Sequence, residues 1–216
     1  MLKAMIRLQW RAVWHIVAAL TVAGLLLPLA SVRTGWKGGL TNLPNFLTEL
    51  QLWGLLYPAL AALAGVALAA GIWSSDRRGH HIYALTLPIP RWRYVLLRYL
   101  AGLTLALPIV AAVWLGSVIA SETLDLPAGL RIFPHALAAK FALALIVLFG
   151  FAFAIAASSS RALGIGVRFL ALLVAVHLGV VMLYPKTNIL WSLVTGLATW
   201  PGPFAALGGR WMLIDV

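Results

Sequence analysis

The residues of this chain that could carry out chemistry are few and isolated. Cysteine is absent, which excludes disulfides, thiolate metal sites and cysteine nucleophiles. The pattern G-x-x-x-x-G-K-[ST], which cradles ATP phosphates, does not occur in the sequence. The metalloprotease pattern H-E-x-x-H and the serine-hydrolase pattern G-x-S-x-G are also missing. We therefore expect this chain to have no catalytic residues, no metal site and no cofactor of its own.

The remaining candidates are polar side chains inside long apolar stretches. His177 is the clearest, because an ionisable residue within a membrane span is a functional candidate by default. A neutral histidine bonded to a neighbouring helix is the simpler explanation. Gln51, Tyr57 and Ser117 have similar surroundings and could line a pathway, although such residues more often bond to their own helix. Ser117 facing His177 would suit a six-span intramembrane serine protease, which is one alternative class.

The composition indicates a membrane protein. Hydrophobic residues make up 63% of the 216 residues and charged residues only 10%, against ~45–50% and ~25% in soluble domains. In a soluble protein a net charge of +11 would suggest nucleic acid. Here the basic residues are better explained as holding membrane loops on the cytoplasmic side, so no nucleic-acid partner is expected. We predict an all-α integral membrane protein with a single transmembrane domain over residues 1–216.

Six long runs without a charged residue mark the predicted membrane spans, because a charge near the bilayer centre is costly. Each run approaches or exceeds the ~20 residues that a helix needs to cross ~30 Å of hydrocarbon. The runs are Ala12–Val32, Leu50–Ser75, Tyr99–Ser121, Phe141–Ser160, Phe169–Pro185 and Thr187–Gly209. The last run contains Pro201 and Pro203, which should kink or break it. It could therefore be a re-entrant pair of half-helices, since the link around Lys186 is very short.

The positions of the basic residues predict the orientation. With both termini inside, the cytoplasmic segments hold most of the 16 lysines and arginines. We therefore expect a multi-pass protein of the plasma (bacterial inner) membrane with cytoplasmic termini. Residues 1–12 should form an amphipathic helix in the inner interface, because Lys3, Arg7 and Arg11 share one face and Gln9 lies opposite. A simple charged lead-in is the alternative.

Small residues recur at every fourth position in the second and third runs. Such faces let two helix backbones approach closely. Packing within the chain is a simpler explanation for them than a dimer seam. The two sets are Ala61, Gly65 and Ala69, and Ala112, Gly116 and Ala120.

The loop predicted between the second and third spans, residues 74–94, is the most informative stretch. It is too long for a tight helical turn, and its apolar residues, among them Tyr83 and Leu87, would be poorly placed in water. A short amphipathic helix would press them against the membrane or a partner protein. Pro88 and Pro90 would end that helix.

This loop resembles the membrane subunits of the ABC type-2 permease family, exporters in which a separate ATPase drives the membrane protein. Asp76 stands for the acidic residue of the family pattern, and Gly79 for its glycine. Pro88 follows nine positions after the glycine, and Pro88–Arg91 matches the turn before the third helix. The chain departs from the family at residues 80–82, where His-His-Ile replaces the common Thr-Leu-Glu.

The resemblance implies a fold and a set of partners. The fold is an ABC type-2 exporter-like bundle of six transmembrane helices, and the loop is a coupling helix that fits a groove of the ATPase. The implied partners are an ABC ATPase subunit that carries ATP and Mg, a second permease chain, identical or homologous, and membrane lipid. A haem-exporter-like ABC subunit and a membrane scaffold are the alternatives. The coupling role falls on Asp76, Arg77, Gly79, Tyr83, Leu87, Pro88 and Arg91.

Overall fold

The computed structural model divides into two compact units, Met1–Phe153 with Arg210–Val216, and Ala154–Gly209. It describes residues 2–35, 53–78, 90–123, 131–158 and 213–215, with single residues at 165, 168, 172, 175, 176, 196 and 211. In the second unit the described single residues all have helical backbone.

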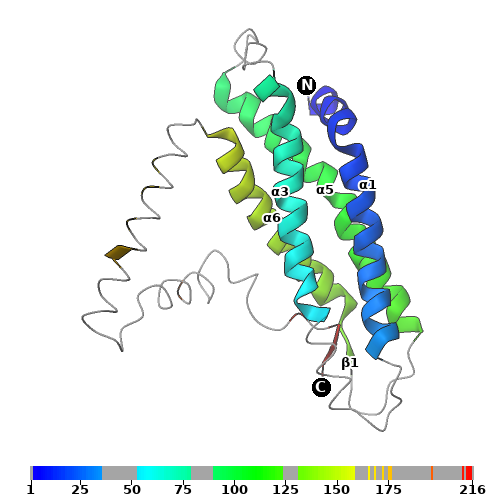
Figure 1. Ribbon diagram of the computed structural model, residues 1–216. Coiled ribbons are helices and arrows are strands. Elements are labelled where there is room, and N and C mark those ends of the chain that lie inside the picture. Colours follow the sequence, from blue (N-terminus) through cyan, green and yellow to red (C-terminus); the bar gives the residue numbers. More distant parts are fainter. Residues whose placement is uncertain are drawn as a thin grey trace. The chain divides into compact units, whose positions relative to one another are not determined.

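Four long helices dominate the described part of the chain (Figure 1). They are α1 (Leu2–Gly35), α3 (Leu56–Arg78), α5 (Arg91–Glu122) and α6 (Pro134–Ala157). Each is long and apolar enough to cross a membrane. They coincide with the first four predicted spans, so that part of the prediction is confirmed. The structure therefore has four such helices among the residues it describes, not six. The fifth and sixth predicted spans lie outside the described residues apart from a few single positions.

Prolines stand at the starts of α5 and α6. Helix α5 also begins earlier than the charge-free run that marked its predicted span. Pro134 is the first residue of α6, a position where a missing N–H costs nothing. The carbonyl of Pro90 accepts the first hydrogen bonds of α5, from the backbone N–H groups of Arg93 and Tyr94 at 3.0 and 3.2 Å. With 32 residues α5 is about 48 Å long, whereas the hydrocarbon layer is about 30 Å thick. The helix can therefore include the charged residues of its first turns.

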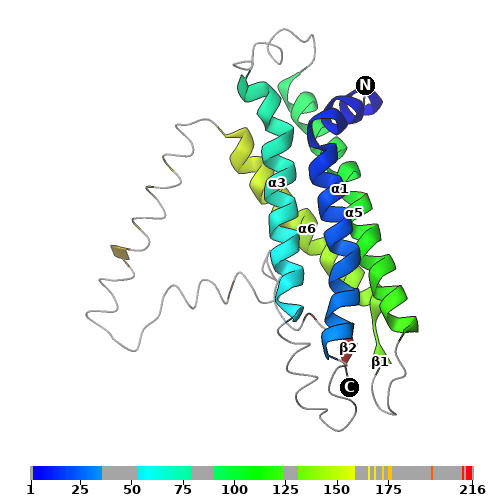
Figure 2. The same cartoon turned by 45° about the vertical axis from the view of Figure 1, so that its right-hand side comes forward.

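The predicted interfacial helix over residues 1–12 is part of α1 and not a separate element. Its first turns bend away from the axis of the rest of α1 (Figures 1 and 2). The predicted faces are correct, since Lys3, Arg7 and Arg11 are exposed whereas Gln9 is buried. The polar face therefore points away from the bundle.

The small-residue faces of α3 and α5 pack against other helices of the same chain, which was the simpler of the two explanations. A Cβ on Gly65 of α3 would lie only 2.8 Å from the backbone nitrogen of Phe149 in α6. Gly116 of α5 lies against the backbone of Leu25 in α1 in the same way. The alanines of both faces are also buried. Close backbone approach therefore occurs at both the α3–α6 and the α1–α5 contact.

A short C-terminal strand closes the end of the bundle opposite the N-terminus (Figure 2). Strand β2 (Ile214–Asp215) pairs antiparallel with β1 (Arg131–Ile132), which directly precedes α6. The N–H of Phe133 also donates to the carbonyl of Leu213 at 2.9 Å. The two termini thus lie at opposite ends of the four helices. The predicted cytoplasmic location of both termini stays a prediction.

Candidate functional site

The end of α3 and the start of α5, which flank the predicted coupling loop, lie at the N-terminal end of the bundle (Figure 1). The loop was predicted over residues 74–94. Helix α3 continues to Arg78 and α5 starts at Arg91, so the connection between them is residues 79–90. The sequence has no proline between Pro58 and Pro88, so none breaks α3 at the end of its apolar stretch.

The structure places three of the seven predicted coupling residues at the two ends of this connection. Asp76 and Arg77 are in the last turn of α3. Arg91 is the first residue of α5 and is exposed. The other four, Gly79, Tyr83, Leu87 and Pro88, lie outside the described residues.

A buried arginine joins the two helices that flank this connection. The side chain of Arg98, on α5, is 1% exposed. Its Nη2 donates a hydrogen bond of 2.5 Å to the backbone carbonyl of Ile72 on α3, and its Nη1 donates to the hydroxyl of Tyr94. The guanidinium carbon lies 4.6 Å from the ring centroid of Trp73 and 5.4 Å from that of Tyr94. Arg98 thus connects α5 to α3 through the hydrogen bond to Ile72 and the ring contact with Trp73.

The same position is tied to α1 through its backbone. The Nε2 of Gln9, 2% exposed, donates a 3.1 Å hydrogen bond to the carbonyl oxygen of Arg98. Near this bond α1 and α3 approach closely, because a Cβ on Gly71 would lie 2.6 Å from Cγ1 of Val13. We call Gln9, Ile72, Trp73, Tyr94 and Arg98 together the Arg98 cluster. It joins the first turns of α1, the last turns of α3 and the first turns of α5.

The contacts of the Arg98 cluster suit a cation held away from water. Burying a charge costs several kcal/mol unless other groups replace its hydration. A carbonyl and a hydroxyl accept hydrogen bonds from Arg98, and such bonds to a charged group contribute about 1.5–3 kcal/mol each. The faces of Trp73 and Tyr94 add cation–π attraction. The guanidinium therefore has specific partners that a mobile side chain would lose.

The sequence argument missed the Arg98 cluster because it began the third span at Tyr99, after the last charge. Two signals were present. Tyr94 and Arg98 are four residues apart, so on a helix they share a face. Gln9 is the one polar residue on the apolar side of the first twelve residues. Neither signal indicates which helix lies opposite, so the contact to Ile72 had no counterpart in the sequence.

The predicted pathway residues divide into two buried ones and two outside the described part. Tyr57 is 2% exposed, and its ring stacks on Trp211 with centroids 6.4 Å apart. Ser117 is fully buried and donates a 2.7 Å hydrogen bond to the carbonyl of Val113, four residues earlier in its own helix. Gln51 and His177 lie outside the described residues. Tyr57 and Ser117 therefore take part in packing in this structure, and the Ser117–His177 pair of the protease alternative is not described.

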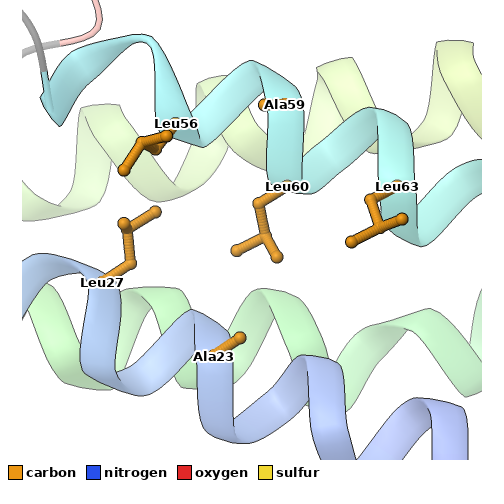
Figure 3. Close-up of a pocket in the computed structure, with 6 residues that line it drawn as sticks. All are labelled: Ala23, Leu27, Leu56, Ala59, Leu60 and Leu63. Atoms are coloured by element: carbon orange, nitrogen blue, oxygen red, sulfur yellow. The ribbon is translucent and has the colours of Figure 1, made fainter.

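An apolar pocket of about 250 Å³ opens between α1 and α3 (Figure 3). Only alanine and leucine side chains line it, and Leu63 and Leu56 are 60% and 45% exposed. Such a lining offers no hydrogen-bonding side chain to orient a polar substrate, so it suits hydrocarbon. The lining residues are Ala23, Leu27, Leu56, Ala59, Leu60 and Leu63.

Within the residues that the structure describes, no three histidines, aspartates or glutamates come together as a possible metal site. The exposed His135 accepts a 2.9 Å hydrogen bond at Nδ1 from Nε1 of Trp114. This contact links α5 to the start of α6.

No protein-family model, curated protein or solved structure matches this chain. The resemblance to ABC type-2 permeases therefore rests on the residues of the loop.

Proposed function

We propose that this chain is the transmembrane (permease) subunit of an ATP-driven ABC exporter. Two permease chains, identical or homologous, would form the pathway, and a separate ATPase subunit would bind ATP and Mg. The observation that supports this proposal most directly is that α3 and α5 extend as helices past their apolar stretches to Arg78 and Arg91. A partner that pushes on residues 79–90 would thus act directly on two membrane-crossing helices.

The surface at this end of the bundle supports a cytoplasmic location. Lys3, Arg7 and Arg11 on α1 and Arg91 and Arg93 on α5 are all exposed there. Exposed lysine and arginine favour the cytoplasmic side of a membrane. We therefore place the N-terminus and the connection 79–90 on the cytoplasmic side of a bacterial inner membrane. The C-terminal strand then lies on the outer side, in place of the two cytoplasmic termini predicted from charge.

The proposal assigns coupling, not catalysis, to the loop residues. Tyr83 and Leu87 would insert into a groove on the ATPase, where truncating a buried aromatic typically costs about 2 kcal/mol or more of binding. Gly79 would permit close approach, Pro88 would end the loop helix, and Arg91 would meet acidic groups of the partner. Closure of the ATPase pair would then shift α3 and α5 and open the pathway to the other side.

The test is co-purification of the chain with a candidate ABC ATPase subunit, followed by measurement of ATP hydrolysis in reconstituted vesicles. Tyr83→Ala and Leu87→Asp should each weaken association or uncouple hydrolysis from transport, while the helices still insert. Phe133→Ala is the matched control, because Phe133 is an exposed aromatic residue at the opposite end of the bundle. Unchanged association and hydrolysis for both loop variants would refute the coupling role. A chain that binds no ATPase would favour the scaffold alternative.

A further inference from the structure

The Arg98 cluster lies at a matched depth in three helices. Ile72 is six residues from the end of α3, Arg98 seven residues from the start of α5, and Gln9 seven residues from the start of α1. At about 1.5 Å per residue, each tie lies about 10 Å from its helix end. The hydrogen bonds that join the three helices are therefore at nearly the same distance from the three helix ends.

We infer that Arg98 is a positioning residue that makes the three helix ends next to the loop move as one body. This inference rests on the proposed function, because it explains how a push on residues 79–90 would reach α1 as well as α3 and α5. Arg98 transmits this movement through Ile72 and Gln9 and does not itself contact the ATPase.

The chemistry of the cluster explains why an arginine suits this role better than an apolar residue. Leucine or methionine at position 98 would pack against Trp73 but could not donate a hydrogen bond to the carbonyl of Ile72. The guanidinium finds few other hydrogen-bond acceptors in an apolar interior, so breaking its bond to the carbonyl of Ile72 costs free energy. Its planar donors also fix the direction of the contact. The result is a fixed junction between α3 and α5.

Two glycines next to the cluster are in close contact with side chains of neighbouring helices, which supports a fixed junction. A Cβ on Gly102, one turn after Arg98, would lie 2.8 Å from Cδ1 of Ile72 and 3.2 Å from Cε1 of Phe149. On the other side, Gly71 is in close contact with Val13. The helices therefore touch through glycines directly beside the hydrogen bonds, and this leaves little space for one to shift relative to another.

The experiment uses pairs of spin labels on the full chain, which has no native cysteine. Ala70→Cys with Leu96→Cys reports the α3–α5 distance, and Leu8→Cys with Leu96→Cys reports the α1–α5 distance. All three positions are exposed, so labels there leave the core intact. In the unsubstituted background each pair should give a single narrow distance distribution.

Arg98→Met should abolish the single narrow distance for the α3–α5 pair only, because Gln9 bonds to the backbone carbonyl of residue 98, which this substitution keeps. Gln9→Leu should abolish it only for the α1–α5 pair, because the bond to Ile72 remains. Arg98→Lys should restore the α3–α5 distance, since an ammonium group can still donate to the carbonyl. Ser117→Ala is the matched control. It removes a buried hydroxyl group of α5 whose hydrogen bond stays within that helix, so both distances should stay narrow.

A narrow and unchanged α3–α5 distance in Arg98→Met would overturn the inference. If that variant does not insert, the selective effect of Gln9→Leu decides, and equal effects on both pairs would also overturn it. In vesicles that also contain the ATPase, Gln9→Leu should lower the stimulated rate of ATP hydrolysis per bound ATPase. The association of the chain with the ATPase should not weaken. If the unsubstituted chain binds no ATPase, the proposed function fails, while the distances still decide whether the Arg98 junction exists.

Discussion

Adding one methyl group at Gly65 should destabilise the protein, although alanine is a better helix former than glycine. The helix propensity of alanine alone would stabilise α3 by about 0.5–1 kcal/mol. Against this, the new Cβ would lie 2.8 Å from the nitrogen of Phe149 and 3.0 Å from the carbonyl carbon of Leu148. Both atoms belong to the backbone of α6, so a helix must move, and such overpacking costs about 1–3 kcal/mol. The packing cost exceeds the propensity gain, and Gly65→Ala should lose about 1–2 kcal/mol.

Gly150→Ala is the matched control for this prediction. A Cβ at Gly150 would lie 3.3 Å from the hydroxyl oxygen of Tyr99, the tip of a side chain that can shift by a few tenths of an ångström. The propensity gain is the same in both variants, so the difference between them measures the α3–α6 contact alone. Thermal unfolding in one detergent should therefore show Gly65→Ala melting below the unsubstituted protein, and Gly150→Ala at or slightly above it.

Two results would contradict this reasoning. Equal melting temperatures for the two variants would mean that α3 and α6 are not in backbone contact at Gly65. A loss of self-association without a loss of stability would instead assign the Ala61–Ala69 face to a dimer seam, the alternative that the sequence also allowed.

Three further predictions concern the ends of the bundle. Lys3→Cys and Asp215→Cys should react with a membrane-impermeant reagent from opposite sides, and reaction from one side would refute the observed placement of the termini. Tyr94→Phe removes the hydroxyl that accepts a bond from Arg98, so the unfolding free energy should fall by about 0.5–2 kcal/mol, and no change would show that this bond contributes little. Trp211→Leu should cost about 0.5–1.5 kcal/mol through loss of its aromatic stack and should speed proteolysis of the C-terminus, whereas an unchanged cleavage rate would mean that the C-terminus is held without it.

The four described helices were predictable because one physical rule governs them. A charge in hydrocarbon is costly, so each long charge-free run marked a helix that could cross. The same rule misplaced the start of α5, because a helix longer than the hydrocarbon layer can carry Arg91 and Arg98 on its first turns. The faces around Gly65 and Gly116 were also predictable, since a small residue at every fourth position has few other uses in a membrane.

The contacts between helices were harder to predict because they depend on which helices are neighbours. Arg98 and Ile72 are 26 residues apart and Gln9 is 89 residues from Arg98, and no local spacing relates them. The pairing of Arg131 with Asp215 joins two strands of two residues each, too short to leave a periodic pattern. Tyr57 was selected as a polar residue in an apolar span, yet its ring serves a stack on Trp211. Sequence reasoning could assign such residues to helices but not to partners.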